Sequence, residues 1–134
     1  MPRTDEVEIV SPNAAKALGD VIAGELLVAG QQTGLTAGTT QTQVGAVFGG
    51  NVGHIVVATC ANANDGLRLP VAKRAGRYLV VTNSGAQNLK IWPSTAGTIN
   101  GGSANAADAT VLATGKSRMY ISTSALNWTL YTFE

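Results

Sequence analysis

Short apolar runs separated by turn residues fill the C-terminal part of the chain. The run at 54–59 is rich in β-branched residues and predicts a strand. Similar runs predict strands at 76–83, 88–92, 110–113, 117–122 and 126–133. Their turn signals recur about every 8–12 residues, as in β-sandwiches and barrels and unlike units that alternate strand and helix. The pattern therefore predicts an all-β fold, a single small β-sandwich or a jelly-roll or barrel-like domain.

Turn residues mark where these strands end. The segment 62–66 ends in Asp65-Gly66, and this pair is expected to supply the positive φ of a tight turn. Pro93 ends the strand at 88–92 because proline cannot donate to a strand ladder. Asn100-Gly101-Gly102 predicts a further turn.

Alternation within the strands predicts which side chains face the core. Leu89 and Ile91 share one face of their strand, as do Met119 and Ile121. The same parity places Leu126, Trp128 and Leu130 on the core side. Four aromatic residues then fall on the opposite face, which we expect to be a subunit interface. These interface candidates are Tyr78, Trp92, Tyr120 and Tyr131.

The N-terminal residues differ in pattern from the rest. Residues 1–34 are expected to form an N-terminal arm and linking segment, and residues 35–134 the β-rich domain. Pro12 could begin a helix, and apolar residues follow near helical spacing. Gly19 and Gly24 would weaken that helix, and the rival interpretation is two short strands broken at Gly24. A strand or an extended arm is favoured over the helix.

Composition adds that much of the surface is uncharged. The chain has 134 residues, enough for one domain, and only 5% of them are aromatic. Charged residues make up 13%, about half the usual share of ~25%. A core with few large residues and a surface with few charges suggest that neighbouring subunits cover part of the domain.

The charges are unevenly placed. Residues 1–65 carry two basic and six acidic side chains, a net charge of −4, whereas residues 66–134 carry seven basic and two acidic ones, a net charge of +5. This asymmetry suits head-to-tail docking between subunits. Nucleic acid is not expected as a partner, because the basic residues are not clustered with aromatic residues along the chain.

Residues for catalysis or metal binding are scarce. His54 is the only histidine and Cys60 the only cysteine, so a zinc tetrad and an internal disulfide are both excluded. After residue 66 only Asp108 and Glu134 are acidic, which argues against a glycosidase pair. We expect no catalytic, cofactor-binding or metal-binding residues. No signal peptide and no apolar run of about 20 residues is seen. We therefore expect synthesis in a cytoplasm and no membrane partner.

Short motifs follow one another in a fixed order at 65–70, 76–93, 97–100, 104–107, 113–116 and 127–128. Together they make residues 53–131 resemble a recurring virion module of tailed bacteriophages. Trp92 occupies a position where a smaller aromatic residue is usual, and residues 1–34 match no part of the module. The resemblance implies an all-β, often trimeric head decoration (cement) protein or another accessory virion protein, with no cofactor.

That resemblance implies a non-enzymatic homotrimer on the outer capsid surface, with the major capsid protein as its partner. The candidate capsid contacts are Arg3, Asp5, Glu6, Glu8, Arg68, Lys73 and Arg74. The plainer interpretation of the basic group at 68–77 is a solvated loop. The alternative function is a head-fibre or tail-tip module that binds a host glycan or protein, with Trp92 and Tyr131 as sugar platforms.

Overall fold

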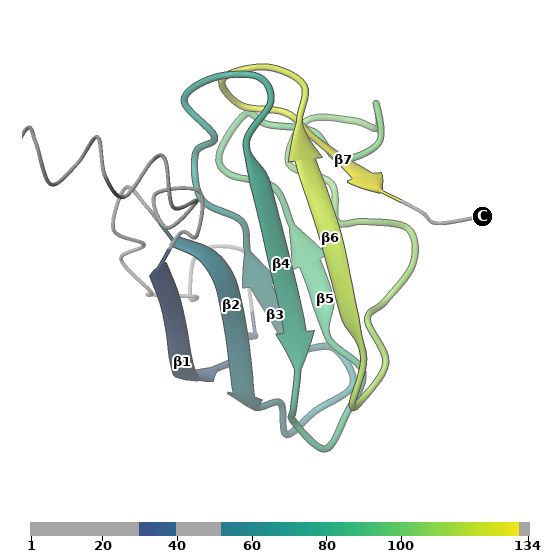
Figure 1. Cartoon of the computed structure of the whole chain (residues 1–134). Coiled ribbons are helices and arrows are strands. Elements are labelled where there is room, and N and C mark those ends of the chain that lie inside the picture. Colours follow the sequence, from purple (N-terminus) through teal and green to yellow (C-terminus); the bar gives the residue numbers. More distant parts are fainter. Residues whose placement is uncertain (1–29, 40–51, 132–134) are drawn as a thin grey trace, which may run out of the picture.

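The computed structural model describes residues 30–39 and 52–131, which form strands and loops without any α-helix (Figure 1). The strands are β1 (Gly30–Thr36), β2 (Val52–Thr59), β3 (Gly66–Arg68), β4 (Tyr78–Asn83), β5 (Lys90–Trp92), β6 (Ser117–Ser122) and β7 (Trp128–Tyr131). The prediction of an all-β fold is confirmed. Within the described ranges, no helix is long and apolar enough to cross a membrane.

The strands form two sheets of unequal size. The large sheet has the order β1-β2-β4-β6-β7, and the small sheet pairs β3 with β5. In the large sheet β1, β2 and β4 run parallel, whereas β6 is antiparallel to both β4 and β7. The small sheet is parallel and lies behind the large one in Figure 1.

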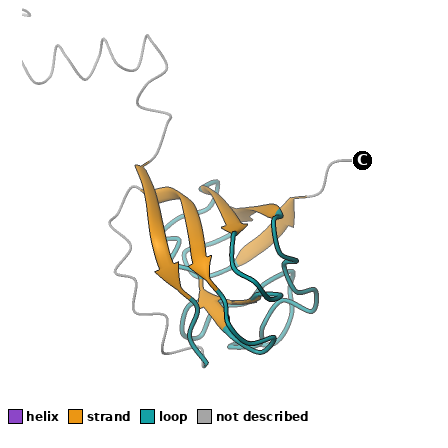
Figure 2. Ribbon diagram, turned by 90° about the horizontal axis from the view of Figure 1, so that it is seen from below, coloured by secondary structure: helices purple, strands orange, loops and turns teal. Residues whose placement is uncertain are grey.

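Parallel pairing without helices follows from the path of the chain. Parallel neighbours need a crossover connection, which is usually a helix. Here the chain passes from β2 to β3, returns to β4 and passes again to β5, so each sheet supplies the crossover for the parallel pairs β2–β4 and β3–β5. Figure 2 shows the loops, in teal, that join the strands.

Isolated backbone pairs outside the named strands connect further segments of the chain. After β1, the Ala37 amide donates to the Thr59 carbonyl at 2.8 Å, and Gly38 pairs with Gly66. Leu112 pairs with Leu89, just before β5. The chain around Gly38 thus leads from the large sheet to the small one.

The core lies between the two sheets. Ile55 and Val57 from β2 and Leu79 and Val81 from β4 are fully buried. From the small sheet, Leu67 and Ile91 are also inaccessible to solvent. Each such side chain contributes about 1.5–3 kcal/mol when it is buried completely. Leu89 and Ile91 were therefore assigned correctly to the core.

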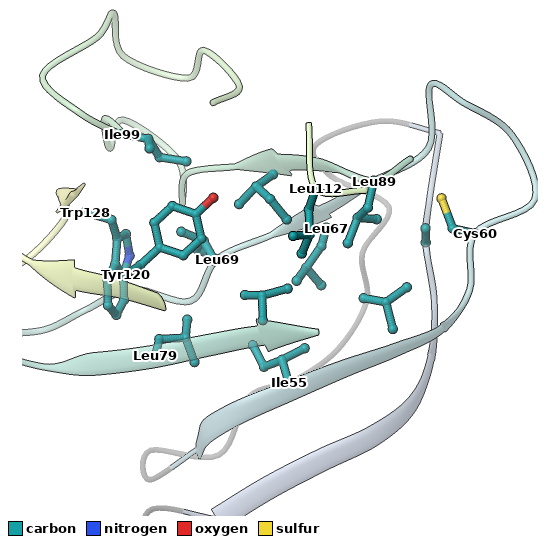
Figure 3. Packing of buried hydrophobic residues seen from close by; sticks show 14 of the residues in the cluster. Ile55, Cys60, Leu67, Leu69, Leu79, Leu89, Ile99, Leu112, Tyr120 and Trp128 are labelled. Carbon is teal, nitrogen blue, oxygen red and sulfur yellow. The ribbon is translucent and has the colours of Figure 1, made fainter. Parts of the chain in front are cut away.

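The inward face of β6 was predicted wrongly. Tyr120 is fully buried and sits between Leu79 and Leu130 in the register of the sheet, while Met119 and Ile121 face outward. Figure 3 shows the Tyr120 ring in the core beside Trp128. Alternation shows that β6 has two faces. Because the inward face carries polar groups, the sequence alone did not indicate that this face is the buried one. Tyr120 is therefore not a subunit-interface residue.

Several predicted boundaries also change. Residues 110–113 contain only the bridge at Leu112, and the last strand begins at Trp128, which leaves Leu126 36% exposed. The expected limit between residues 34 and 35 falls inside β1, so the first residues of that strand belong to the sheet. The helix or strand expected within 11–29 lies outside the described residues.

Of the two turns predicted from glycine residues, one has the expected backbone conformation and the other does not. Asn100 and Gly101 both have positive φ, at 54° and 71°, as the predicted turn requires. Gly66 does not have positive φ, so the reason given for Asp65-Gly66 is wrong. A side chain at Gly66 would instead collide with the indole of Trp92.

Candidate docking surface

The solvent side of the large sheet carries an apolar surface. Tyr78 and Val80 of β4, Met119 and Ile121 of β6, and Tyr131 of β7 project away from the core, and we call these five residues the outer apolar face. Tyr78 is opposite Ile121, and Met119 lies between Val80 and Tyr131 in the register. Tyr78 is 62% exposed and Tyr131 43% exposed. Contiguous apolar side chains of this kind mark surfaces that bind other proteins.

A row of hydrogen-bonded polar side chains crosses the same side of the sheet. The Gln31 side-chain amide lies 2.9 Å from Nδ1 of His54, and Nε2 of His54 lies 2.8 Å from the Thr82 hydroxyl. That hydroxyl lies 2.7 Å from the hydroxyl of Ser117. Both ring nitrogens of His54 thus have side-chain partners on neighbouring strands, and the row joins β1, β2, β4 and β6.

Ser122 anchors the basic loop that precedes β4. Its hydroxyl donates to the Arg74 carbonyl at 2.6 Å and accepts a hydrogen bond from the Arg77 amide at 2.8 Å. The Arg77 guanidinium donates to the carbonyls of Val71 and Val52. Burial, and then the nearby charge of Arg74, lower the pKa of Arg77. The loop is therefore held in place while Lys73 and Arg74 remain exposed.

Both carboxylates of the described part are buried. Asp65 is 5% exposed and accepts hydrogen bonds from the backbone and side-chain amides of Asn62. Asp108 is 7% exposed and forms an ion pair with Arg118. In residues 30–39 and 52–131, the charged side chains that reach solvent are consequently all basic.

The predicted site residues do not form one surface. Tyr78 and Tyr131 lie on the outer apolar face, but Arg68 and Trp92 lie on the small sheet. Lys73 and Arg74 belong to the loop before β4. The candidates Arg3, Asp5, Glu6 and Glu8 lie outside the described residues.

Sequence reasoning missed Val80, Met119 and Ile121 as surface residues. Their apolar character assigned Met119 and Ile121 to the core. No local signal could have corrected this, because Arg118 shares a face with Tyr120 and only its pairing with Asp108 in the tertiary structure allows that face to be buried.

Neither the cysteine nor the two acidic residues of the described part expose a reactive group to solvent. Cys60 is buried, and its Sγ lies 3.6 Å from the Asn62 carbonyl oxygen and 3.5 Å from that of Asn88. Burial, and then the charge of Asp65, raise the pKa of the thiol. In the part of the chain with described positions, no group of three His, Cys, Asp or Glu residues could hold a metal ion.

Comparison with known proteins supplies no relative for this chain: no family model, no curated protein and no solved structure matches it.

Proposed function

We propose that this chain is a structural, non-enzymatic virion protein that decorates and stabilises the outside of a tailed-phage capsid. In this proposal it acts as a homotrimer with the major capsid protein as its partner. Its finer fold class is a small β-sandwich or jelly-roll-like domain, which the presence of a core between two sheets supports.

The outer apolar face is the observation that carries the proposal. Apolar surface left in water costs about 25 cal/mol per Å² relative to burial. A partner that covers Tyr78, Ile121 and Tyr131 would recover that free energy. Subunits that assemble around a symmetry axis present such a face to one another.

The basic loop supports a second contact, with the capsid. Lys73 and Arg74 are exposed on a loop that Ser122 holds in place, so little conformational entropy is lost when the loop docks. An acidic capsid surface would complement them and favour the correct orientation of approach. Many copies over a lattice add buried area and avidity to the shell.

Light scattering behind a sizing column tests the oligomer, and cosedimentation with cognate capsids that lack this protein tests decoration. We expect a trimer that binds the capsids. Ile121→Lys should convert the trimer to folded monomers and reduce capsid binding. Lys116→Gln alters an exposed residue outside the outer apolar face and serves as the control.

A folded wild-type monomer would remove the trimer from the proposal. Capsids that sediment without the protein would refute the decoration role.

A further inference from the structure

The small sheet has a solvent side of its own. Leu67 and Ile91 point into the core, so alternation turns Arg68, Lys90 and Trp92 outward. Arg68 pairs with Trp92 in the register, and Gly66 pairs with Lys90. Arg68 comes from β3, whereas Lys90 and Trp92 come from β5, 22 and 24 positions later in the sequence. The three side chains therefore share one face. We call these three residues the Trp92 face.

Gly66 determines how the tryptophan lies on this face. A Cβ atom added at Gly66 would stand 2.6 Å from Nε1 and 2.7 Å from Cδ1 of Trp92. The indole therefore lies across Gly66 and covers it, which explains why this glycine is buried on the solvent side of its strand. Any larger residue would lift the ring away from the sheet. Trp92 itself remains half-buried and offers part of its ring to solvent.

The polar groups of the Trp92 face have no partners within the described residues. Arg118 is paired with Asp108, and Nε1 of Trp128 donates to the Pro70 carbonyl at 3.0 Å. In contrast, Arg68 and Lys90 form no ion pair in this part of the chain, and Nε1 of Trp92 makes no hydrogen bond there. Among the described residues, one aromatic plane thus stands beside two cations that have no counter-charge.

We propose that the Trp92 face binds an acidic saccharide, whose uronate or sulfate group contacts the basic side chains. The apolar face of a sugar ring would pack on the indole, because tryptophan combines a large apolar surface with a polar edge. Arg68 can hold a carboxylate through two parallel hydrogen bonds, and Lys90 adds a compact charge. This binding activity is independent of capsid decoration, because it uses the other layer of the fold.

A single-stranded nucleic acid is the other polyanion to consider. Its binding sites stack successive bases on several aromatic side chains along a basic groove. The Trp92 face has one aromatic residue, and the exposed Tyr78 and Tyr131 lie on the outer side of the large sheet. One ring with two cations fits one or two sugar residues better than a strand.

Tryptophan fluorescence gives a direct assay. The chain has two tryptophans, and Trp128 is fully buried, so a change on titration reports mainly on Trp92. The probes are oligogalacturonate and a neutral maltooligosaccharide of equal length. We expect the acidic oligomer to change the fluorescence at a saturable concentration and the neutral oligomer to have no effect.

Two double variants with the same loss of charge separate a site from general attraction. Arg68→Gln with Lys90→Gln should weaken oligogalacturonate binding by at least about tenfold. Lys73→Gln with Arg74→Gln should change it by less than about twofold. Circular dichroism establishes that both variants are folded, and Arg68→Gln alone replaces the first pair if that pair fails to fold.

Three results would overturn the proposal. The acidic oligomer could fail to bind, or both double variants could weaken it equally, which indicates general charge attraction. A single-stranded oligonucleotide of equal charge could bind more tightly and depend on Arg68 and Lys90, which would make this a nucleic-acid site.

Discussion

Asp108 is the residue on which one end of the core depends. Its Oδ2 accepts hydrogen bonds from the Tyr120 hydroxyl at 2.7 Å and from Arg118 at 3.2 Å. The same guanidinium donates to the carbonyls of Thr110 and Val111. The network joins the loop before β6 to the inward face of that strand. It also lets an arginine and a tyrosine occupy positions that would otherwise require apolar residues.

Replacing Asp108 by asparagine tests this network. We expect Asp108→Asn to lower the free energy of unfolding by about 2–3 kcal/mol, because Arg118 loses its counter-charge in a site that is largely shielded from water. Tyr120→Phe removes the hydroxyl that donates to Asp108 and accepts from Arg118, and it should cost about 1–2 kcal/mol. Urea unfolding measures both. An unchanged midpoint for Asp108→Asn would show that the ion pair adds nothing.

The pKa of the Tyr120 hydroxyl also predicts how the free energy of unfolding depends on pH. Burial raises the pKa of Tyr120 above its ordinary value of 10.0; the hydrogen bond from Arg118 opposes this rise and the hydrogen bond to Asp108 adds to it. The unfolded chain ionises near pH 10 while the folded protein keeps the proton. The stabilisation is therefore complete below about pH 10 and is lost as the pH rises toward the folded pKa.

Unfolding free energies measured from about pH 9 to pH 12 check this prediction. Tyr120→Phe should show a smaller decline above pH 10 than the wild type, because it has no hydroxyl to ionise at this site. Equal slopes for the two proteins would contradict the assignment.

At the scale of elements, β6 separates the two roles of the large sheet. Its inward residues build the core and its outward residues build the outer apolar face. We expect Tyr120→Ala to cost about 3–5 kcal/mol because it leaves a cavity. Ile121→Lys should change the stability of the folded monomer by less than about 1 kcal/mol.

Thermal or urea unfolding of the two variants at low protein concentration makes the comparison. If Ile121→Lys destabilised the monomer as strongly as Tyr120→Ala, the outer side of β6 would be part of the core. The two positions are adjacent on one strand and point to opposite faces, so each variant serves as the control for the other.

The strands themselves were predictable to different degrees. The runs that form β2 and β4 are long and rich in β-branched residues, which identify them, and β6 has its predicted bounds. β3 has three residues and β1 contains Gly30 and Gly34, so neither carries a strong local pattern. Both are strands because of their partners, β5 and β2.

At the scale of the whole molecule, burial changes the charge that a partner meets. The described residues include two carboxylates, and both are turned inward, so the charges that residues 30–39 and 52–131 expose are all basic. The acidic residues Asp5, Glu6 and Glu8 belong to the N-terminal segment, outside the described part. Docking to an acidic partner should therefore depend strongly on ionic strength.

Binding to cognate capsids measured by cosedimentation tests this dependence. Raising the salt concentration from about 0.05 M to about 0.5 M should weaken binding by at least about tenfold, because added ions screen exposed charges. Lys73→Gln with Arg74→Gln should reduce that salt dependence. Binding that salt leaves unchanged would point to the outer apolar face as the capsid contact.

The sequence by itself determined the all-β class, the positions of the longer strands and the turn at 100–102. These features depend on local steric preferences, which each short segment carries with it. Only the tertiary structure decided that Tyr120 faces inward, that Asp65 and Asp108 are buried, and that Trp92 lies over Gly66 beside Arg68 and Lys90. Alternation identifies the two faces of a strand, but partners distant in sequence determine which face is buried.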